Sequence, residues 1–285
     1  MLEHIPVLAA EVLEMLAPRN GGVYFDGTFG GGGYTSAILE SANCKVVACD
    51  RDAYVKNIAS AFSQKYEDRF AFYHSRFSEI KSIVGDALLD GVVLDLGMSN
   101  FQLTDLSRGF SFKSEGPIDM SMGLCDENAL DVIRNYREKE LADIIYKFGE
   151  EHFSRKIARN IKLNLGTINT TEDLANVIRK SVGKFGKIDA ATKTFQALRI
   201  FVNDELGELE KILRDSIGML KSGGKIVIVS FHSLEDRIVK LFFRELVKND
   251  ERYGLLNKKP ITPSQEETLS NSKSRSAKLR GIYVI

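Results

Sequence analysis

The chain has 285 residues, of which 44% are hydrophobic and 27% charged, and its 39 basic and 39 acidic side chains give a formal net charge of zero. This composition is ordinary for a globular protein and excludes a global electrostatic attraction to nucleic acid. No segment approaches the run of about 18 apolar residues that a membrane helix needs, and the first residues lack a signal peptide's features. We therefore expect a cytoplasmic protein.

The three cysteines, Cys44, Cys49 and Cys125, form no C-x-x-C pair. None of the four histidines lies near a cysteine at the spacing of zinc ligands. Reduced thiols are the simplest interpretation, and the sequence predicts no metal site.

The first half of the chain alternates between short apolar segments and segments with helical periodicity. Apolar positions between Leu8 and Leu16 predict an amphipathic helix. Strands are expected at residues 23–25, 45–49, 70–73 and 91–94. Because these strands are continuously apolar and alternate with helices, they predict a parallel sheet covered on both faces.

The alternation stops after Asp95, and residues 126–220 have an almost wholly helical pattern. Within this region, Thr170-x-x-Asp173 predicts a capping box at the start of a helix. Apolar residues recur every three or four positions from Phe195 to Leu213 and predict one long helix.

Strand and helix resume toward the C-terminus. A fifth strand is expected at 225–229, and Ser233-x-x-Asp236 predicts a capping box that opens another helix. A strand-like segment at 282–284 ends the chain. The simplest organisation is an α/β domain made of residues 1–103 and 201–285. A helical domain, residues 104–200, is then inserted into it as the expected RNA-recognition part.

A glycine-rich segment, Asp26-Gly27-Thr28-Phe29-Gly30-Gly31-Gly32-Gly33, follows the first strand directly. Ligands of open α/β sheets bind beyond the carboxyl ends of the strands, so this loop is the expected cofactor site. Its spacing fits neither the G-x-G-x-x-G fingerprint of dinucleotide sites nor the P-loop. Asp26 before the loop and Asp50 after the next strand favour a cationic ligand that carries a ribose and no phosphate. S-adenosylmethionine has these properties, and a purely structural glycine turn is the alternative.

Basic residues gather in two segments of this neutral chain. Residues 176–199 contain six basic residues and one acid, and residues 258–280 contain six basic residues and two acids. These segments are either solvated surfaces or patches that contact phosphates. A helix with Arg155, Lys156, Arg159 and Lys162 would extend such a patch.

Several motifs together resemble a known family, the 16S rRNA (cytosine-N4)-methyltransferases, or RsmH/MraW family. Each motif is weak alone, but they occur in the family's order over nearly the whole chain. They are His4-Ile5-Pro6-Val7-Leu8, Asp26-Gly27-Thr28-Phe29-Gly30, Asp50-Arg51-Asp52, Leu94-Asp95-Leu96-Gly97, Arg108-Gly109-Phe110-Ser111-Phe112, Gly116-Pro117-Ile118-Asp119-Met120, Gly149-Glu150-Glu151, Thr194-Phe195-Gln196-Ala197-Leu198-Arg199-Ile200, Ser230-Phe231-His232-Ser233-Leu234-Glu235-Asp236-Arg237 and Arg275-Ser276-Ala277-Lys278-Leu279-Arg280.

The resemblance implies a class I S-adenosylmethionine-dependent methyltransferase, with a Rossmann-like α/β sheet and an inserted helical domain. It implies cofactor contacts from Gly32, Gly33, Tyr34, Asp50, Phe77, Asp95 and Gln102. The chain departs from the family's pattern at two places. Tyr34 stands where histidine is common, and Asn100-Phe101 stands where Ser-Pro is usual.

The implied reaction is methylation of the N4 amine of a cytidine in 16S rRNA, near the decoding site. The implied partner is this RNA or the small ribosomal subunit, without DNA or membrane, for a monomer or homodimer. The resemblance identifies no catalytic residue. The candidates for substrate contact are Asn100, which could accept a hydrogen bond from the amine, and Arg199, His232, Lys278 and Arg280. A structural role is the alternative for His232.

Other functions stay open at this stage. The same cofactor site would serve a methyltransferase of DNA, protein or small molecules. A ribosome-assembly factor on a decayed methyltransferase fold would lack activity, although the acids and the glycine loop argue against it. A nicotinamide oxidoreductase is disfavoured by the glycine spacing.

Overall fold

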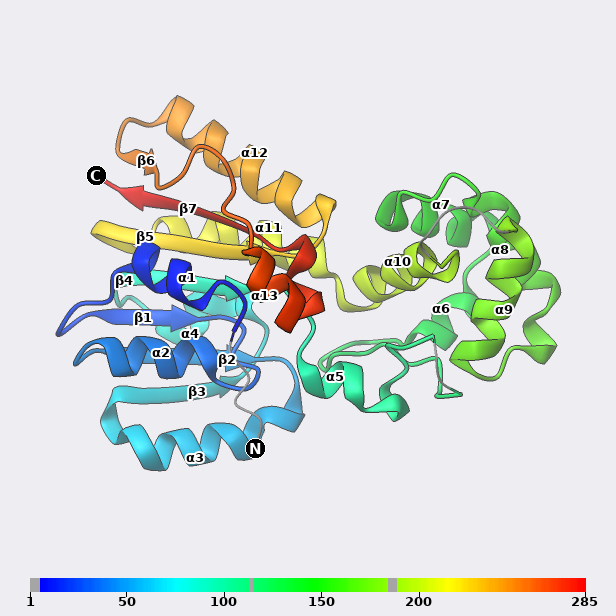
Figure 1. Cartoon of the computed structure of the whole chain (residues 1–285), viewed down its shortest axis with the longest axis horizontal. Helices are drawn as coiled ribbons and strands as arrows, with labels where there is room; N and C mark the ends of the chain where they lie inside the picture. The colour runs from blue at the N-terminus through cyan, green and yellow to red at the C-terminus, as the bar shows by residue number, and fades with distance from the viewer. Residues whose placement is uncertain (1–5, 113–114, 184–188) are drawn as a thin grey trace. The chain divides into compact units, whose positions relative to one another are not determined.

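The computed structural model describes residues 6–112, 115–183 and 189–285 (Figure 1). The chain divides into two units, of which the first joins Met1–Gly97 to Leu206–Ile285 and the second is Met98–Glu205. The expected insert, residues 104–200, lies within the second unit. His4, Lys184 and Lys187 lie outside the described residues.

The first unit contains a seven-stranded sheet with the strand order β3-β2-β1-β4-β5-β7-β6. Strands β1 to β5 are parallel, and β7 lies antiparallel to both β5 and β6. The strands are β1 (Val23–Asp26), β2 (Lys45–Asp50), β3 (Phe70–His74), β4 (Leu89–Asp95), β5 (Leu220–Ser230), β6 (Tyr253–Leu255) and β7 (Lys278–Val284). The expected strands are therefore confirmed, while β6 had no clear sequence signal because it is only three residues long.

Both faces of this sheet are buried, as the continuously apolar strands predict. Successive residues of β4 point to opposite faces, so Val93 joins one hydrophobic cluster and Val92 and Leu94 join the other. The first cluster contains apolar residues of α1 (Ala9–Leu16), α2 (Gly33–Ser41) and α3 (Lys56–Tyr66). The second contains residues of α4 (Ile80–Val84), α11 (Glu205–Ile217) and α12 (Ser233–Asn249). A short helix, α13 (Gln265–Ser270), precedes β7.

The second unit is helical and has a hydrophobic core of its own. Its helices are α5 (Asn100–Thr104), α6 (Ala129–Asn135), α7 (Glu138–Gly149), α8 (Ser154–Leu163), α9 (Thr171–Val182) and α10 (Ala191–Asn203). The predicted capping box of α9 is confirmed, since Thr170 Oγ1 accepts from the amide of Asp173 and the Asp173 carboxylate accepts from the amide of Thr170. No helix among the described residues combines the length and apolarity needed to cross a membrane.

The single long helix predicted from Phe195 to Leu213 is wrong, because the structure has α10 and α11 in its place. The break falls at Asp204, which adopts a left-handed conformation with φ of 47° and ends α10. Its amide donates to the carbonyls of Ile200 and Phe201. The apolar spacing continues through the break, so periodicity alone could not show it.

The second predicted capping box is shifted by one residue. His232, and not Ser233, is the N-cap of α12, and its partner is Glu235 instead of Asp236. Asp236 is thereby left to pair with Lys278 and Arg280 of β7.

Candidate cofactor site

The glycine loop connects β1 to α2 and is tied to the ends of two neighbouring strands. The amide of Gly30 donates to Asp50 Oδ2 at 2.7 Å, at the end of β2. Thr28 Oγ1 accepts from the amide of Asp95 at 2.7 Å, at the end of β4. The loop is thus held where the carboxyl ends of β1, β2 and β4 meet (Figure 1).

The glycines of this loop are required for different reasons. Gly32 has φ of 78°, and a Cβ built on it would lie 2.4 Å from the Phe62 ring. A Cβ on Gly33 would lie 2.7 Å from the ring of Pro6. A Cβ on Gly31 would meet nothing within 4 Å. Gly32 and Gly33 therefore make room for the protein's own side chains, and the backbone at Gly31 is the part of the loop left uncovered.

Three aspartates, which we call the strand-end carboxylates, lie at the ends of β1, β2 and β4: Asp26, Asp50 and Asp95. Asp26 is fully buried and accepts from the Thr28 amide and the Thr35 hydroxyl. Burial raises the pKa of Asp26 and of Asp50 to about 6, and that of Asp95 to about 7. Desolvation without a basic partner disfavours the charged carboxylate, so a cation placed here would be stabilised.

Each oxygen of Asp50 accepts one backbone hydrogen bond, Oδ2 from Gly30 at 2.7 Å and Oδ1 from Asp52 at 2.9 Å. A carboxylate has about four lone-pair positions, so both oxygens can accept a further hydrogen bond. A pair of neighbouring ribose hydroxyls supplies two donors of the required kind. The residues at this strand end therefore fit a ribose.

Tyr34 and Phe77 take different positions around the loop. Tyr34, in the first turn of α2, is 3% exposed, and its hydroxyl donates to the carbonyl of Val7. It thereby fixes the segment that precedes α1. Phe77 begins a short 3-10 helix after β3, and a Cβ on Gly27 would lie 2.9 Å from its own Cβ. Phe77 therefore packs directly against the start of the glycine loop.

An ion pair beside Phe77 had no signal in the sequence. Arg76 Nη1 lies 3.4 Å from Glu208 Oε1, which comes from the first turn of α11. Glu208 is 6% exposed, so this pair fixes the backbone next to Phe77 from within the fold. Two residues separated by 132 positions carry no common motif, and only the tertiary structure reveals them.

Three of the predicted site residues, Gln102, Asn100 and Arg199, belong to the second unit. Gln102 is 6% exposed, and its Oε1 accepts from the amide of Ser99 in a capping box. Asn100 is the first residue of the same helix, α5. Arg199 forms two hydrogen bonds with the carboxylate of Glu205, each at 2.7 Å.

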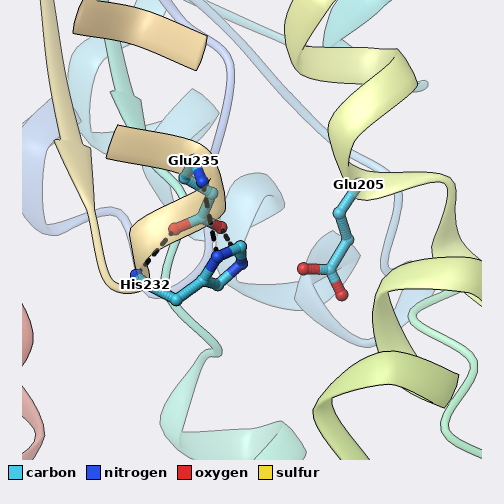
Figure 2. Close-up of side chains that lie close together, drawn as sticks. All are labelled: Glu205, His232 and Glu235. Carbon is cyan, nitrogen blue, oxygen red and sulfur yellow. Dashed lines mark hydrogen bonds and ion pairs between the residues drawn. The ribbon is translucent and has the colours of Figure 1, made fainter. Parts of the chain in front are cut away.

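His232 lies at the end of β5 and is held by Glu235 (Figure 2). Its Nδ1 accepts from the amide of Glu235 at 3.4 Å, and its Nε2 lies 3.0 Å from Glu235 Oε1. Glu235 is 2% exposed, and its Oε2 accepts from the amides of Phe231 and His232. This arrangement gives His232 the structural role of starting α12, and a substrate contact stays a prediction.

The basic side chains of β7 are held by an acid of α12. Arg280 is 8% exposed, and its Nε donates to Asp236 Oδ1 at 2.7 Å. Lys278 Nζ donates to Asp236 Oδ2 at 3.0 Å. Because Asp236 already neutralises part of this charge, phosphate binding by Lys278 or Arg280 would have to compete with an existing ion pair. The pattern of basic residues in segment 258–280 could not predict this ion pair, because the acidic partner lies about 40 positions earlier in the chain.

The donor set at this sheet edge suits S-adenosylmethionine. The strand-end carboxylates complement a sulfonium, Asp50 fits a ribose, and the loop has no basic side chain of the kind that binds phosphates. The sheet order, with β7 antiparallel at the β5 side, is that of a Rossmann-like methyltransferase. Fold and site together define a class I S-adenosylmethionine-dependent methyltransferase, which confirms the expected fold class.

Comparison with known proteins gives the family. The MraW methylase family matches residues 1–285, and the chain belongs to it. It is 49% identical over 290 residues to the "Ribosomal RNA small subunit methyltransferase H" of Wolbachia sp. subsp. Drosophila simulans (strain wRi), covering 99% of both chains. It is 50% identical over 286 residues to the protein of the same name from Neorickettsia sennetsu, covering 98% of this chain and 95% of that one.

Proposed function

We propose that this protein transfers a methyl group from S-adenosylmethionine to the N4 amine of a cytidine in 16S ribosomal RNA, near the decoding site. The observation that carries the proposal is the set of strand-end carboxylates around the glycine loop, in a chain that belongs to the MraW methylase family. The relatives' names support small-subunit rRNA as the substrate. The N4 position and the decoding site rest on the family resemblance.

The chemistry requires orientation more than acid–base catalysis. The cofactor supplies an electrophilic methyl group on a sulfonium, which departs as a neutral thioether. The amine of cytosine is a weak nucleophile, because its lone pair is delocalised into the ring. Holding it in line with the methyl–sulfur bond can contribute much of the rate, since effective molarities of well-oriented groups reach roughly 10⁵ M.

The chain's own residues would divide this work. Asp50 would accept hydrogen bonds from the ribose hydroxyls and so hold S-adenosylmethionine in place. The negative charge of the strand-end carboxylates would stabilise the positive charge of the sulfonium. Asn100 accepts a hydrogen bond from the amine of the cytosine, and Phe101 stacks on the base. The amine loses one proton as the new C–N bond forms, and water can accept it.

Methyl transfer from labelled donor is the test. Small-subunit rRNA should incorporate label, and DNA and bulk protein should not. Digestion and mass mapping should place the methyl group on the N4 of one cytidine. Label found only in DNA or only in protein would show that this molecule, and not rRNA, is the substrate. If calorimetry shows no binding of the methyl donor, the protein is an assembly factor without activity.

The role of Asn100 has its own test. Asn100→Ala should lower turnover at saturating RNA roughly tenfold or more, because the amine loses an acceptor that orients it. Asn100→Asp, which keeps an acceptor oxygen, should retain more activity. An alanine variant with the parent's turnover would remove Asn100 from the mechanism.

A further inference from the structure

A polar groove of about 410 Å³ lies within the helical unit. Its lining residues come from α8, the following turn and α9: Asn160, Asn164, Thr167, Asp173, Asn176, Val177 and Lys180. Figure 1 shows α8 and α9 side by side in this unit. The volume falls within the range of about 300–1,000 Å³ that small-molecule sites occupy, and it suits a single nucleotide.

Helical spacing brings the polar side chains together. Asn160 and Asn164 are four residues apart on α8 and its C-terminal end, so they share one face. Asp173, Asn176 and Lys180 follow one another at intervals of three and four on α9 and also share a face. Asn160 Nδ2 donates to Ser181 Oγ at 2.8 Å, which holds the two helices in register.

Each asparagine side chain of this groove uses one of its two polar atoms, Oδ1 or Nδ2, in a hydrogen bond within the protein. Asn164 Nδ2 donates to the carbonyl of Asn160 at 2.8 Å, and Asn160 Nδ2 donates to Ser181. The carbonyl oxygens of both amides are thereby left as acceptors. Asn176 is held at the opposite end, since its Oδ1 accepts from Arg179 Nη1 at 3.0 Å, which leaves its Nδ2 as a donor.

Charge is concentrated on the same helix pair. Residues 154–183 contain six basic and two acidic side chains, and Asp189, just beyond them, pairs with Arg179 at 2.8 Å. With Asp189 included, the net charge is +3 in a protein whose formal net charge is zero. Lys180 is exposed at the groove and has no ion-pair partner in the described part of the chain. The acid of the groove, Asp173, stays ionised, because hydrogen bonds from the amides of Asn169 and Thr170 lower its pKa. It lies about two helical turns, or roughly 10 Å along α9, from Lys180. A phosphate is therefore favoured at the Lys180 end.

We propose that this groove binds an unpaired nucleotide of the substrate RNA, away from the methylated base. Lys180 contacts the phosphate, Asn176 donates to the nucleotide, and the carbonyl oxygens of Asn160 and Asn164 accept from the exocyclic amine of the base. RNA recognition is directed mostly at unpaired segments, where base edges are accessible to such groups. The inference rests on the proposed function, because it assigns the place where the helical unit holds the RNA.

The test compares Lys180→Ala and Asn176→Ala with Lys139→Ala. Lys139 is an exposed lysine in the first turn of α7, in the same unit but outside the groove, and its loss changes the net charge equally. KM for small-subunit rRNA should rise roughly tenfold for Lys180→Ala and about fivefold for Asn176→Ala. Lys139→Ala should change it by less than about twofold. The turnover at saturating RNA and the affinity for S-adenosylmethionine should stay at parent values for all three.

Salt titration separates the roles of the two groove residues. The slope of log affinity against log salt should fall by about 1 for Lys180→Ala, which loses a phosphate contact, and should not change for Asn176→Ala. Parent-like KM for both groove variants, or an equal effect of Lys139→Ala, would overturn the groove while leaving the methylation intact. The groove variants could also bind assembled subunits poorly but protein-free rRNA normally. That result would mean that the groove contacts a ribosomal protein, and it would overturn the proposal of a nucleotide site. If the parent enzyme methylates no small-subunit rRNA, the proposed function itself fails.

Discussion

Replacing Asp50 by alanine should remove most of the affinity for S-adenosylmethionine. Each carboxylate oxygen of Asp50 accepts one backbone hydrogen bond and can accept a second one from a ribose hydroxyl. A hydrogen bond to a charged group contributes about 1.5–3 kcal/mol, so the loss of two costs about 3 kcal/mol or more. That corresponds to a Kd roughly 150-fold higher. Asp50→Asn keeps one acceptor oxygen and should weaken binding by roughly tenfold.

Isothermal titration calorimetry with S-adenosylmethionine measures this directly. The matched control is Asp68→Ala, which removes an exposed acid from the short 3-10 helix before β3 and should leave Kd unchanged. Thermal melting shows whether the Asp50 variants stay folded, since the amides of Gly30 and Asp52 lose an acceptor. A folded Asp50→Ala protein whose Kd lies within about threefold of the parent's would refute the assignment of the ribose site.

Three further predictions concern stability. The raised pKa values of the strand-end carboxylates mean that the folded protein holds these protons more tightly than the unfolded chain. Their contribution to the free energy of unfolding is complete below about pH 4 and is lost as pH rises through 6 to 7. Urea titrations at pH 5 and pH 7.5 measure how much free energy of unfolding is lost between these two pH values. Without cofactor, this loss should be about 2 kcal/mol smaller for Asp95→Asn than for the parent, and equal losses would contradict the burial argument. Gly32→Ala should destabilise the protein by about 1–3 kcal/mol because of its φ of 78° and the 2.4 Å approach to a phenylalanine ring, whereas Gly31→Ala should be tolerated. Thermal melts that rank these two variants in the reverse order would show that the loop is built differently. Asp236→Ala should cost about 3–5 kcal/mol, because it leaves the buried Arg280 without its partner, and a parent-like chemical denaturation midpoint would show that the pair is dispensable.

Local sequence patterns predicted much of the sheet and of the cofactor edge. Each of β1 to β5 contains an uninterrupted apolar run of at least three residues, so these strands could be recognised without knowledge of their neighbours. The aspartates that end β1, β2 and β4 follow directly from those strand boundaries, because parallel strands end at the same edge. The glycine spacing fits neither the dinucleotide fingerprint nor the P-loop, and this can be read from the loop alone.

Other features depend on contacts between distant residues. Phe62 and Pro6, which pack against Gly32 and Gly33, lie far from these glycines in the chain. The break at Asp204 interrupts a pattern whose apolar period continues unchanged on both sides.

Short stretches of the chain were enough to predict the class of sheet, the sheet edge with the glycine loop and the strand-end carboxylates, and the helical character of the inserted segment. Each of these features depends on residues close together in the chain. The tertiary structure decided which polar groups are already engaged. Asp236 binds Arg280 from 44 positions away, and Glu208 reaches Arg76 from 132 positions away. The polar groove of the helical unit likewise depends on how α8 packs against α9. Periodicity describes one element at a time, whereas an ion pair or a groove is a property of two elements packed together.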